Sequence, residues 1–346
     1  MVTVSQKVHY IIMNSYISPL KKSDGIVMLA LLVFASVAAY LSLYFGGTEQ
    51  LSVSEGTDAF IFHHIRLPKT ITAVLAGTTL SLAGLTLQIV FRNPLAGPYV
   101  LGVSSGASLF VAGGLLASTT LHWSMHLLGG KLFIVACAVC GSLMATLLIL
   151  AIARKVAGNV ILLLIGLMIA QICGALQMSL EYFAEPYNLK TFVIWGMGSL
   201  GNTTLSDLQV YVPLAICFVV FLFLRLKPLT AMLYGENYSQ NLGFDFRRER
   251  FLLILIASLM TGLTTAFCGP IAFVGIAVPI FSRMLFRSSD LWLHFFSSSL
   301  LGSILLLLAD ALSSNVSDGI SLPINMITTL IGAPLVIYLM FKNRQW

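Results

Sequence analysis

Charged side chains are scarce in this chain. They make up only 9% of its 346 residues, against about 25% in a soluble domain. Apolar residues reach 58%, which excludes a disordered chain and a soluble enzyme. The 19 basic residues outnumber the 13 acidic ones, but they stand singly or in twos and threes between long uncharged runs, which excludes a nucleic-acid surface. The composition is that of an integral membrane protein.

Cysteine is also sparse, and its placement excludes a disulfide framework. All five cysteines fall inside apolar runs, where a thiol behaves as a small hydrophobic group. Cys137 and Cys140 have the spacing of metal ligands, but no histidine and no second cysteine pair stands near them. We therefore interpret them as packing residues of one helix and predict no metal site.

A phosphate-binding loop is missing as well. The only Gly-Lys pair, Gly130-Lys131, is followed by Leu132 instead of Ser or Thr, and no glycine stands five residues before Gly130. The chain therefore cannot hydrolyse ATP by itself, and we predict that it is not an enzyme.

Acidic residues are absent from the centres of the apolar runs. Glu181, Asp290 and Asp310 all lie at predicted ends of spans, whereas an ion-coupled carrier usually keeps an ionisable side chain near the bilayer centre. This pattern disfavours proton or sodium coupling, and an ion-coupled secondary transporter remains the more distant alternative.

What the sequence does contain is a series of apolar runs of membrane-spanning length. Runs of about 17 residues or more predict an all-α membrane protein with ten spans in a single transmembrane domain, 1–346. The spans are expected at 26–46, 68–91, 99–118, 132–153, 160–180, 208–226, 251–268, 270–286, 291–312 and 322–341. The break between 251–268 and 270–286 is the weakest, because only Gly269-Pro270 interrupts the apolar run there.

The basic residues indicate how these spans are oriented. With an even number of spans, both termini lie on one side, and 15 of the 19 basic residues fall on that side. Only Arg66, Lys69, Lys131 and Lys190 fall on the other side. Because cytoplasmic loops carry the excess of Lys and Arg, we predict that both termini are cytoplasmic.

The longest connection on the cytoplasmic side, 227–250, has an amphipathic pattern. Leu229, Met232, Leu233 and Leu242 alternate with polar residues such as Glu236, which predicts one or two short helices under the membrane. Such a segment is a docking surface for a partner.

Small and weakly polar residues gather in two spans. Gly102, Ser104 and Ser105 belong to the third, and Gly166 and Gln171 to the fifth. They allow helices to approach closely, and the same residues also suit a wide pathway lined by weakly polar side chains.

Seven motifs follow one another along residues 60–341. They are Arg66-Leu67-Pro68-Lys69, Ser81-Leu82-Ala83-Gly84 with Gln88, Arg92-Asn93-Pro94-Leu95-Ala96-Gly97-Pro98, Leu101-Gly102-Val103-Ser104-Ser105-Gly106-Ala107, Trp195-Gly196-Met197-Gly198-Ser199-Leu200, Gly269-Pro270-Ile271-Ala272-Phe273-Val274-Gly275 and Ile331-Gly332-Ala333-Pro334. In this order they resemble the signature of the iron-chelate and vitamin B12 permease family, the membrane subunits of type II ABC importers.

The resemblance implies an assembly in the cell inner membrane. It consists of two permease copies (a homodimer, or a heterodimer with a paralogue), two cytoplasmic ATPase subunits and an extracytoplasmic substrate-binding protein, surrounded by lipid and without a nucleic-acid partner. No cofactor is expected on this chain, because ATP and Mg²⁺ belong to the ATPase. The implied cargo is a ferric siderophore or similar metal chelate, with haem or cobalamin as alternatives.

The resemblance also implies roles for particular residues. The cytoplasmic segment would couple to the ATPase through Gly235, Glu236, Leu242 and Gly243. On the outer face, Arg66 and Lys69 match basic residues that pair with acids of the binding protein. A third basic position is occupied here by Ser313 and Ser314, so the docking pattern must differ in detail.

Gate and pathway residues are implied in the same way. The cytoplasmic gate would be formed by Asn93 and Leu95, with Asn159 and Val160 opposite. The pathway lining would include Ser104, Ser105, Gln171 and Asn325. Asn325 stands where the family often has glycine, and it adds a polar group to the last span.

Overall fold

The computed structural model describes residues 22–45, 60–116, 131–153, 159–286, 288–314 and 322–342, and these contain helices but no strand. Helices suit a membrane protein because they satisfy their backbone hydrogen bonds internally. In chain order they are α2 (Lys22–Phe45), η1 (Phe62–Arg66), α4 (Leu67–Phe91), α5 (Val103–Leu116), α6 (Lys131–Ala153), α7 (Asn159–Tyr182), α8 (Pro186–Gly196), α9 (Leu205–Leu224), α10 (Leu226–Tyr234), α11 (Glu236–Asn241), α12 (Phe246–Cys268), α13 (Val274–Leu285), α14 (Leu291–Ser314) and α15 (Ile324–Lys342).

The predicted spans correspond to ten of these helices. Seven helical segments are long and apolar enough to cross a membrane, and α5, α13 and α15 are shorter apolar helices. The predicted break at Gly269-Pro270 is also confirmed, since α12 ends at Cys268 and α13 begins at Val274. The all-α membrane fold expected from the sequence is therefore confirmed.

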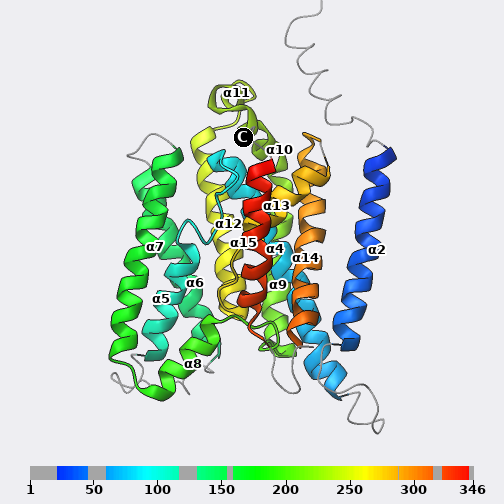
Figure 1. The fold of residues 1–346 in the computed structure, drawn as a ribbon. Helices are drawn as coiled ribbons and strands as arrows, with labels where there is room; N and C mark the ends of the chain where they lie inside the picture. Colours follow the sequence, from blue (N-terminus) through cyan, green and yellow to red (C-terminus); the bar gives the residue numbers. More distant parts are fainter. Residues whose placement is uncertain are drawn as a thin grey trace, which may run out of the picture.

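The helices stand side by side, with α10 and α11 at one end of the bundle and α8 at the other (Figure 1). We call these the α11 end and the α8 end. Ser42, near the end of α2, and Asn325, at the start of α15, both make their contacts at the α8 end. Lys22 and Lys342, where the described chain begins and ends, therefore both lie at the α11 end.

Helix α4 forms the centre of the bundle. In the apolar 18-residue stretch of its span 83% of the residues are buried, whereas only 11% are buried in the corresponding stretches of α2 and α7, which lie at the periphery. Glycines allow α4 to approach its neighbours closely: a Cβ atom on Gly77 would overlap the backbone of Gly302 in α14, and one on Gly84 would overlap the backbone of Gly275 in α13. Small residues are the usual means of close helix packing in membranes.

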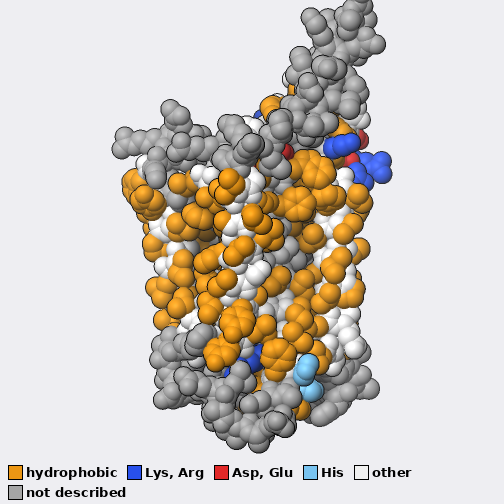
Figure 2. Space-filling view, turned by 90° about the vertical axis from the view of Figure 1, so that its right-hand side faces the viewer, with side chains coloured by type: hydrophobic (Ala, Val, Ile, Leu, Met, Phe, Trp, Pro, Cys, Tyr) orange, Lys and Arg blue, Asp and Glu red, His pale blue; other side chains and the backbone are white. Residues whose placement is uncertain are grey.

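The outer surface suits a lipid environment. Figure 2 shows a face that is mostly apolar over the height of the bundle, with Lys and Arg side chains gathered mainly near one end. On α2, exposed apolar side chains include Ile26, Leu29, Val33 and Val37. Such a face would be a liability in water, but it matches the hydrocarbon region of a bilayer.

Hydroxyl groups connect α4, α9 and α12 inside the bundle. The hydroxyls of Thr79 and Thr264 lie 2.7 Å apart, and the phenol of Tyr211 donates to Thr264 at 3.2 Å. All three side chains are buried. Interhelical hydrogen bonds of this kind stabilise helix association where the hydrophobic effect is absent.

Candidate coupling, gate and docking sites

The amphipathic segment predicted over 227–250 contains two short helices, α10 and α11, before α12 begins at Phe246. The chain turns between them at Gly235, whose φ of +113° is a conformation that side chains disfavour. On α10, Leu229 and Met232 are buried against the bundle. The sequence predicted one or two short helices here, and the structure has two.

The four predicted coupling residues all lie on the corner that these helices form. Glu236 begins α11 and is exposed, and its carboxylate accepts a 3.4 Å hydrogen bond from Gln240. Leu242 caps the C-terminus of α11, and Gly243 follows with a φ of +83°. We call residues 226–243 the coupling corner. Its contact with a partner stays a prediction.

The predicted gate residues Asn93 and Leu95 lie in the loop 92–102 between α4 and α5. The Asn93 side-chain carbonyl accepts the Leu95 N–H at 2.9 Å, and the Asn93 N–H donates to the Gln88 carbonyl at 3.0 Å. The Asn93 side chain thus shapes a turn, a common role of asparagine. Asn159 and Val160 begin α7, but their side chains lie outside the described part of the chain, so the gate stays a prediction.

A polar contact that the sequence did not assign fixes this end of α4 to α13. The Arg283 guanidinium donates to the side-chain carbonyl of Gln88, and the Gln88 amide donates to the Ile276 carbonyl at 3.1 Å. Gln88 was visible in the sequence only as a motif residue, and nothing in the sequence paired it with Arg283. Their pairing depends on how α13 folds back along α4.

At the α8 end, Arg66 is buried, with only 3% of its surface exposed. Its guanidinium donates to the carbonyls of Leu43 at 3.2 Å and Tyr44 at 3.0 Å. Both belong to the last turn of α2, where carbonyls have no helical partner and a cation is favoured. In this structure Arg66 therefore caps α2.

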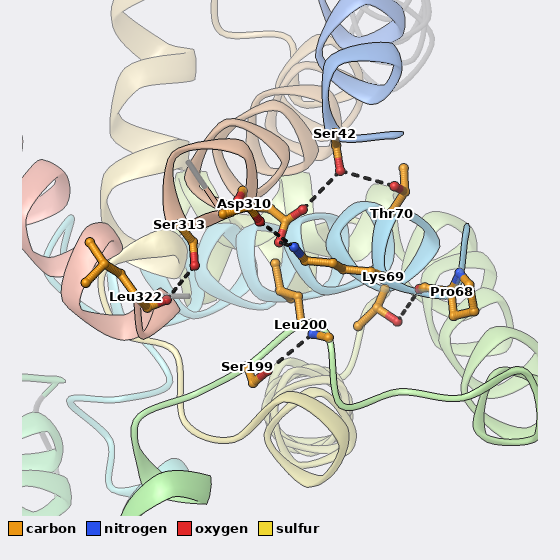
Figure 3. Close-up of polar contacts among 12 residues, drawn as sticks. Ser42, Pro68, Lys69, Thr70, Ser199, Leu200, Asp310, Ser313 and Leu322 are labelled. Carbon is orange, nitrogen blue, oxygen red and sulfur yellow. Dashed lines mark hydrogen bonds and ion pairs between the residues drawn. The ribbon is translucent and has the colours of Figure 1, made fainter. Parts of the chain in front are cut away.

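Lys69 also has partners inside the chain (Figure 3). Its ammonium lies 2.8 Å from Asp310 of α14, whose side chain is fully buried, and it donates to the Ser314 hydroxyl at 2.7 Å. The other oxygen of Asp310 accepts from Ser42 of α2 at 3.1 Å, and Ser42 contacts Thr70 at 3.1 Å. We call Ser42, Lys69, Thr70, Asp310 and Ser314 the Asp310 cluster. It joins α2, α4 and α14.

The serines at the third basic position are part of the same region. Ser314 accepts from Lys69, while the Ser313 hydroxyl donates to the Leu322 carbonyl. Both serines therefore have partners inside the chain. The docking roles predicted for Arg66 and Lys69 stay predictions, but Arg66 already contacts α2 and Lys69 already joins α4 to α14.

The predicted pathway residues are spread over three helices. On α5, Ser104 is buried and Ser105 half-buried, whereas Gln171 is exposed on α7. Asn325 of α15 is half-buried and its side-chain carbonyl accepts the Ala272 N–H at 3.1 Å. Asn325 thus supports the segment between α12 and α13. The role of these four residues in lining a pathway stays a prediction.

The segment that Asn325 supports, 269–273, is non-helical backbone buried among other elements. The Ser199 N–H donates to the Cys268 carbonyl at 2.8 Å, and the Asn325 N–H donates to the Met197 carbonyl at 3.3 Å. Non-helical backbone at membrane depth is tolerated where protein surrounds it. The Gly269-Pro270 motif, the end of α8 and the start of α15 therefore form one packed junction.

The sequence is similar to those of known transport permeases. The chain is 31% identical to the hemin transport system permease protein HmuU of Yersinia pestis, over 96% of this chain and 99% of that protein. It is 32% identical to the vitamin B12 import system permease protein BtuC of Salmonella typhi, over 81% of this chain and 83% of that one.

Solved structures share the fold. An inward-facing structure of a transporter described as being of the metal-chelate ABC type superposes with a TM-score of 0.81, at 25% identity, covering 92% of this chain and 99% of that one. PsaBC from Streptococcus pneumoniae in complex with Fab reaches a TM-score of 0.57 at 16% identity, a likeness of fold. The model of the FecCD transport family matches residues 26–342, and the chain therefore belongs to the FecCD transport family.

Proposed function

We propose that this chain is the membrane permease subunit of a type II ABC importer that brings a bulky metal chelate into the cytoplasm. The observation that carries the proposal is the combination of a match to the FecCD transport family over residues 26–342 with an apolar helical bundle whose sequence has no phosphate loop. ATP and Mg²⁺ would bind to a separate ATPase. This chain would supply the passage.

The two ends of the bundle suit different partners. The coupling corner at the α11 end has exposed side chains, including Leu233, Tyr234 and Glu236, and would dock on the cytoplasmic ATPase. The α8 end would face the extracytoplasmic binding protein. This orientation agrees with the excess of basic residues at the α11 end, and a second permease copy would complete the passage.

The cargo is proposed at the level of a chemical class. A ferric siderophore is the first candidate, and haem and cobalamin are the others, since relatives of this chain are named for hemin and vitamin B12 transport. In such a system the binding protein selects the ligand. Titrating the purified binding protein with a ferric siderophore, haem and cobalamin in parallel would assign the cargo.

The first prediction tests the energy source. In proteoliposomes that contain the permease, its ATPase and its binding protein, uptake should require ATP and should persist when an uncoupler collapses the proton gradient. The isolated permease should bind and hydrolyse no ATP, because it has no phosphate loop.

Two results would contradict this proposal. One is nucleotide hydrolysis by the isolated chain above the level of empty detergent micelles. The other is uptake that stops with the uncoupler while ATP is held constant, which would favour an ion-coupled secondary transporter.

A further inference from the structure

Arg92 connects the end of α4 to the coupling corner. It follows the last residue of α4 and adopts a left-handed conformation, with φ of 48°, which is uncommon for a residue with a side chain. From there its guanidinium donates to the carbonyl of Met232, near the end of α10, at 3.2 Å. A cation at a helix C-terminus is favoured by the helix dipole, so this contact holds the two elements together.

The corner is shaped to receive this side chain. A Cβ atom placed on Gly235 would lie 2.7 Å from the Arg92 Nη2 atom, so the guanidinium occupies the space that a side chain at 235 would need. The Gly235 N–H donates to the same Met232 carbonyl, at 3.2 Å. Arg92 and the turn between α10 and α11 therefore share one acceptor.

On its other side, Arg92 begins a loop that is held together by its own hydrogen bonds. The Ala96 N–H donates to the Asn93 carbonyl at 3.0 Å, the Leu101 N–H to the Gly97 carbonyl at 3.1 Å, and the Val103 N–H to the Pro98 carbonyl at 3.3 Å. Pro94 and Pro98 limit the backbone further. A displacement of Arg92 would therefore move residues 93–102 together, including the candidate gate residues Asn93 and Leu95.

We infer that Arg92 is the positioning residue that transmits movement of the coupling corner to the gate loop. This inference rests on the proposed function and names the contact through which ATPase closure reaches the passage. Arg92 needs no contact with cargo or nucleotide for this role. It acts through the Met232 carbonyl.

The test compares transport with ATP consumption in the full complex of permease, ATPase and binding protein in proteoliposomes. Arg92→Ala should lower the amount of cargo imported per ATP hydrolysed about tenfold, within the range of typical coupling free energies, while ATP hydrolysis stays within about twofold. Arg92→Lys should recover part of the ratio, because lysine keeps a cationic donor but lacks the guanidinium fork. If Arg92 had only a structural role, Arg92→Ala would lower the amount of assembled complex, the ATP hydrolysis and the uptake together. The amount of cargo imported per ATP hydrolysed would then be unchanged.

Two glycines provide a matched pair for the same contact. A Cβ on Gly235 would meet the Arg92 side chain, whereas nothing lies within 4 Å of a Cβ on Gly113, which is in α5 and outside the coupling corner. In the Gly235→Ala background, Arg92→Ala should change the ratio less than about twofold, because contacting residues are not additive. In the Gly113→Ala background it should still cause a loss of about tenfold.

An unchanged ratio in Arg92→Ala would overturn the inference, as would an equal loss in both glycine backgrounds. If Gly235→Ala does not assemble, the inference is tested by comparing the cargo imported per ATP hydrolysed in Arg92→Ala and Arg92→Lys, and equal ratios in these two variants would contradict it. Absence of ATP-driven uptake by the unmodified complex would instead contradict the proposed function. The two failures are therefore distinguishable.

Discussion

Replacing Gly84 by alanine is expected to abolish the folded permease, while the same change at Gly113 leaves it intact. A Cβ on Gly84 would overlap the backbone of Gly275, and backbone atoms cannot move aside as a flexible side chain does. Because α4 is the buried centre of the bundle, α13 would have to shift away from it. Overpacking typically costs about 1–3 kcal/mol and occasionally more, and we place Gly84→Ala at or above the upper end.

Gly113 is the matched control because it lies in a helix, α5, with nothing within 4 Å of its missing Cβ. Alanine there should be neutral or stabilise the helix by up to about 1 kcal/mol. The measurement is the fraction of detergent-solubilised protein that elutes as a single folded species, together with its Tm. Equal yields and Tm values for the two variants would show that the α4–α13 contact is looser than the structure has it.

Replacing either partner of the Lys69–Asp310 pair alone is expected to destabilise the protein strongly, and replacing both should restore most of the loss. The ammonium and carboxylate lie 2.8 Å apart, with side-chain exposures of 13% and 0%. Removing one partner of a buried pair leaves an uncompensated charge and costs about 3–5 kcal/mol, whereas replacing both is often neutral. Lys69→Gln and Asp310→Asn keep hydrogen-bonding groups in place.

Thermal unfolding of Lys69→Gln, Asp310→Asn and the double variant measures this directly. A low Tm for both single variants and a near-normal Tm for the double variant is the expected pattern. If the double variant is as unstable as the two singles combined, the two residues do not act as a pair.

The double variant also tests the docking hypothesis for Lys69 without the loss of fold that a charge reversal would bring. If Lys69 docks the binding protein, the folded double variant should bind it more weakly and with a shallower dependence on salt. Unchanged affinity would contradict docking by Lys69 and leave it as the counterion of Asp310.

The sequence by itself determined the class of protein and the course of the chain. The apolar runs predicted ten of the described helices, because a bilayer requires about 20 apolar residues per span and such runs can be found along the sequence alone. The helices α5 and α13 are shorter than that, with 14 and 12 residues. The break at Gly269-Pro270 and the presence of one or two short helices over 227–250 followed from local rules for glycine, proline and amphipathic periodicity. The structure decided that there are two. The order of the motifs indicated the family, because it is a property of the sequence and does not depend on how the helices pack.

Only the tertiary structure decided which polar groups meet. The sequence placed Lys69 and Arg66 as bases on an outer loop, but packing brings Lys69 to Asp310 of α14 and Arg66 to the last turn of α2. It likewise directs Arg92 to the Met232 carbonyl. A charged side chain in a bundle pairs with a polar group of the neighbouring helix, and which group lies within reach depends on the rotation and separation of the two helices. Glycine contacts such as Gly84 with Gly275 determine that separation.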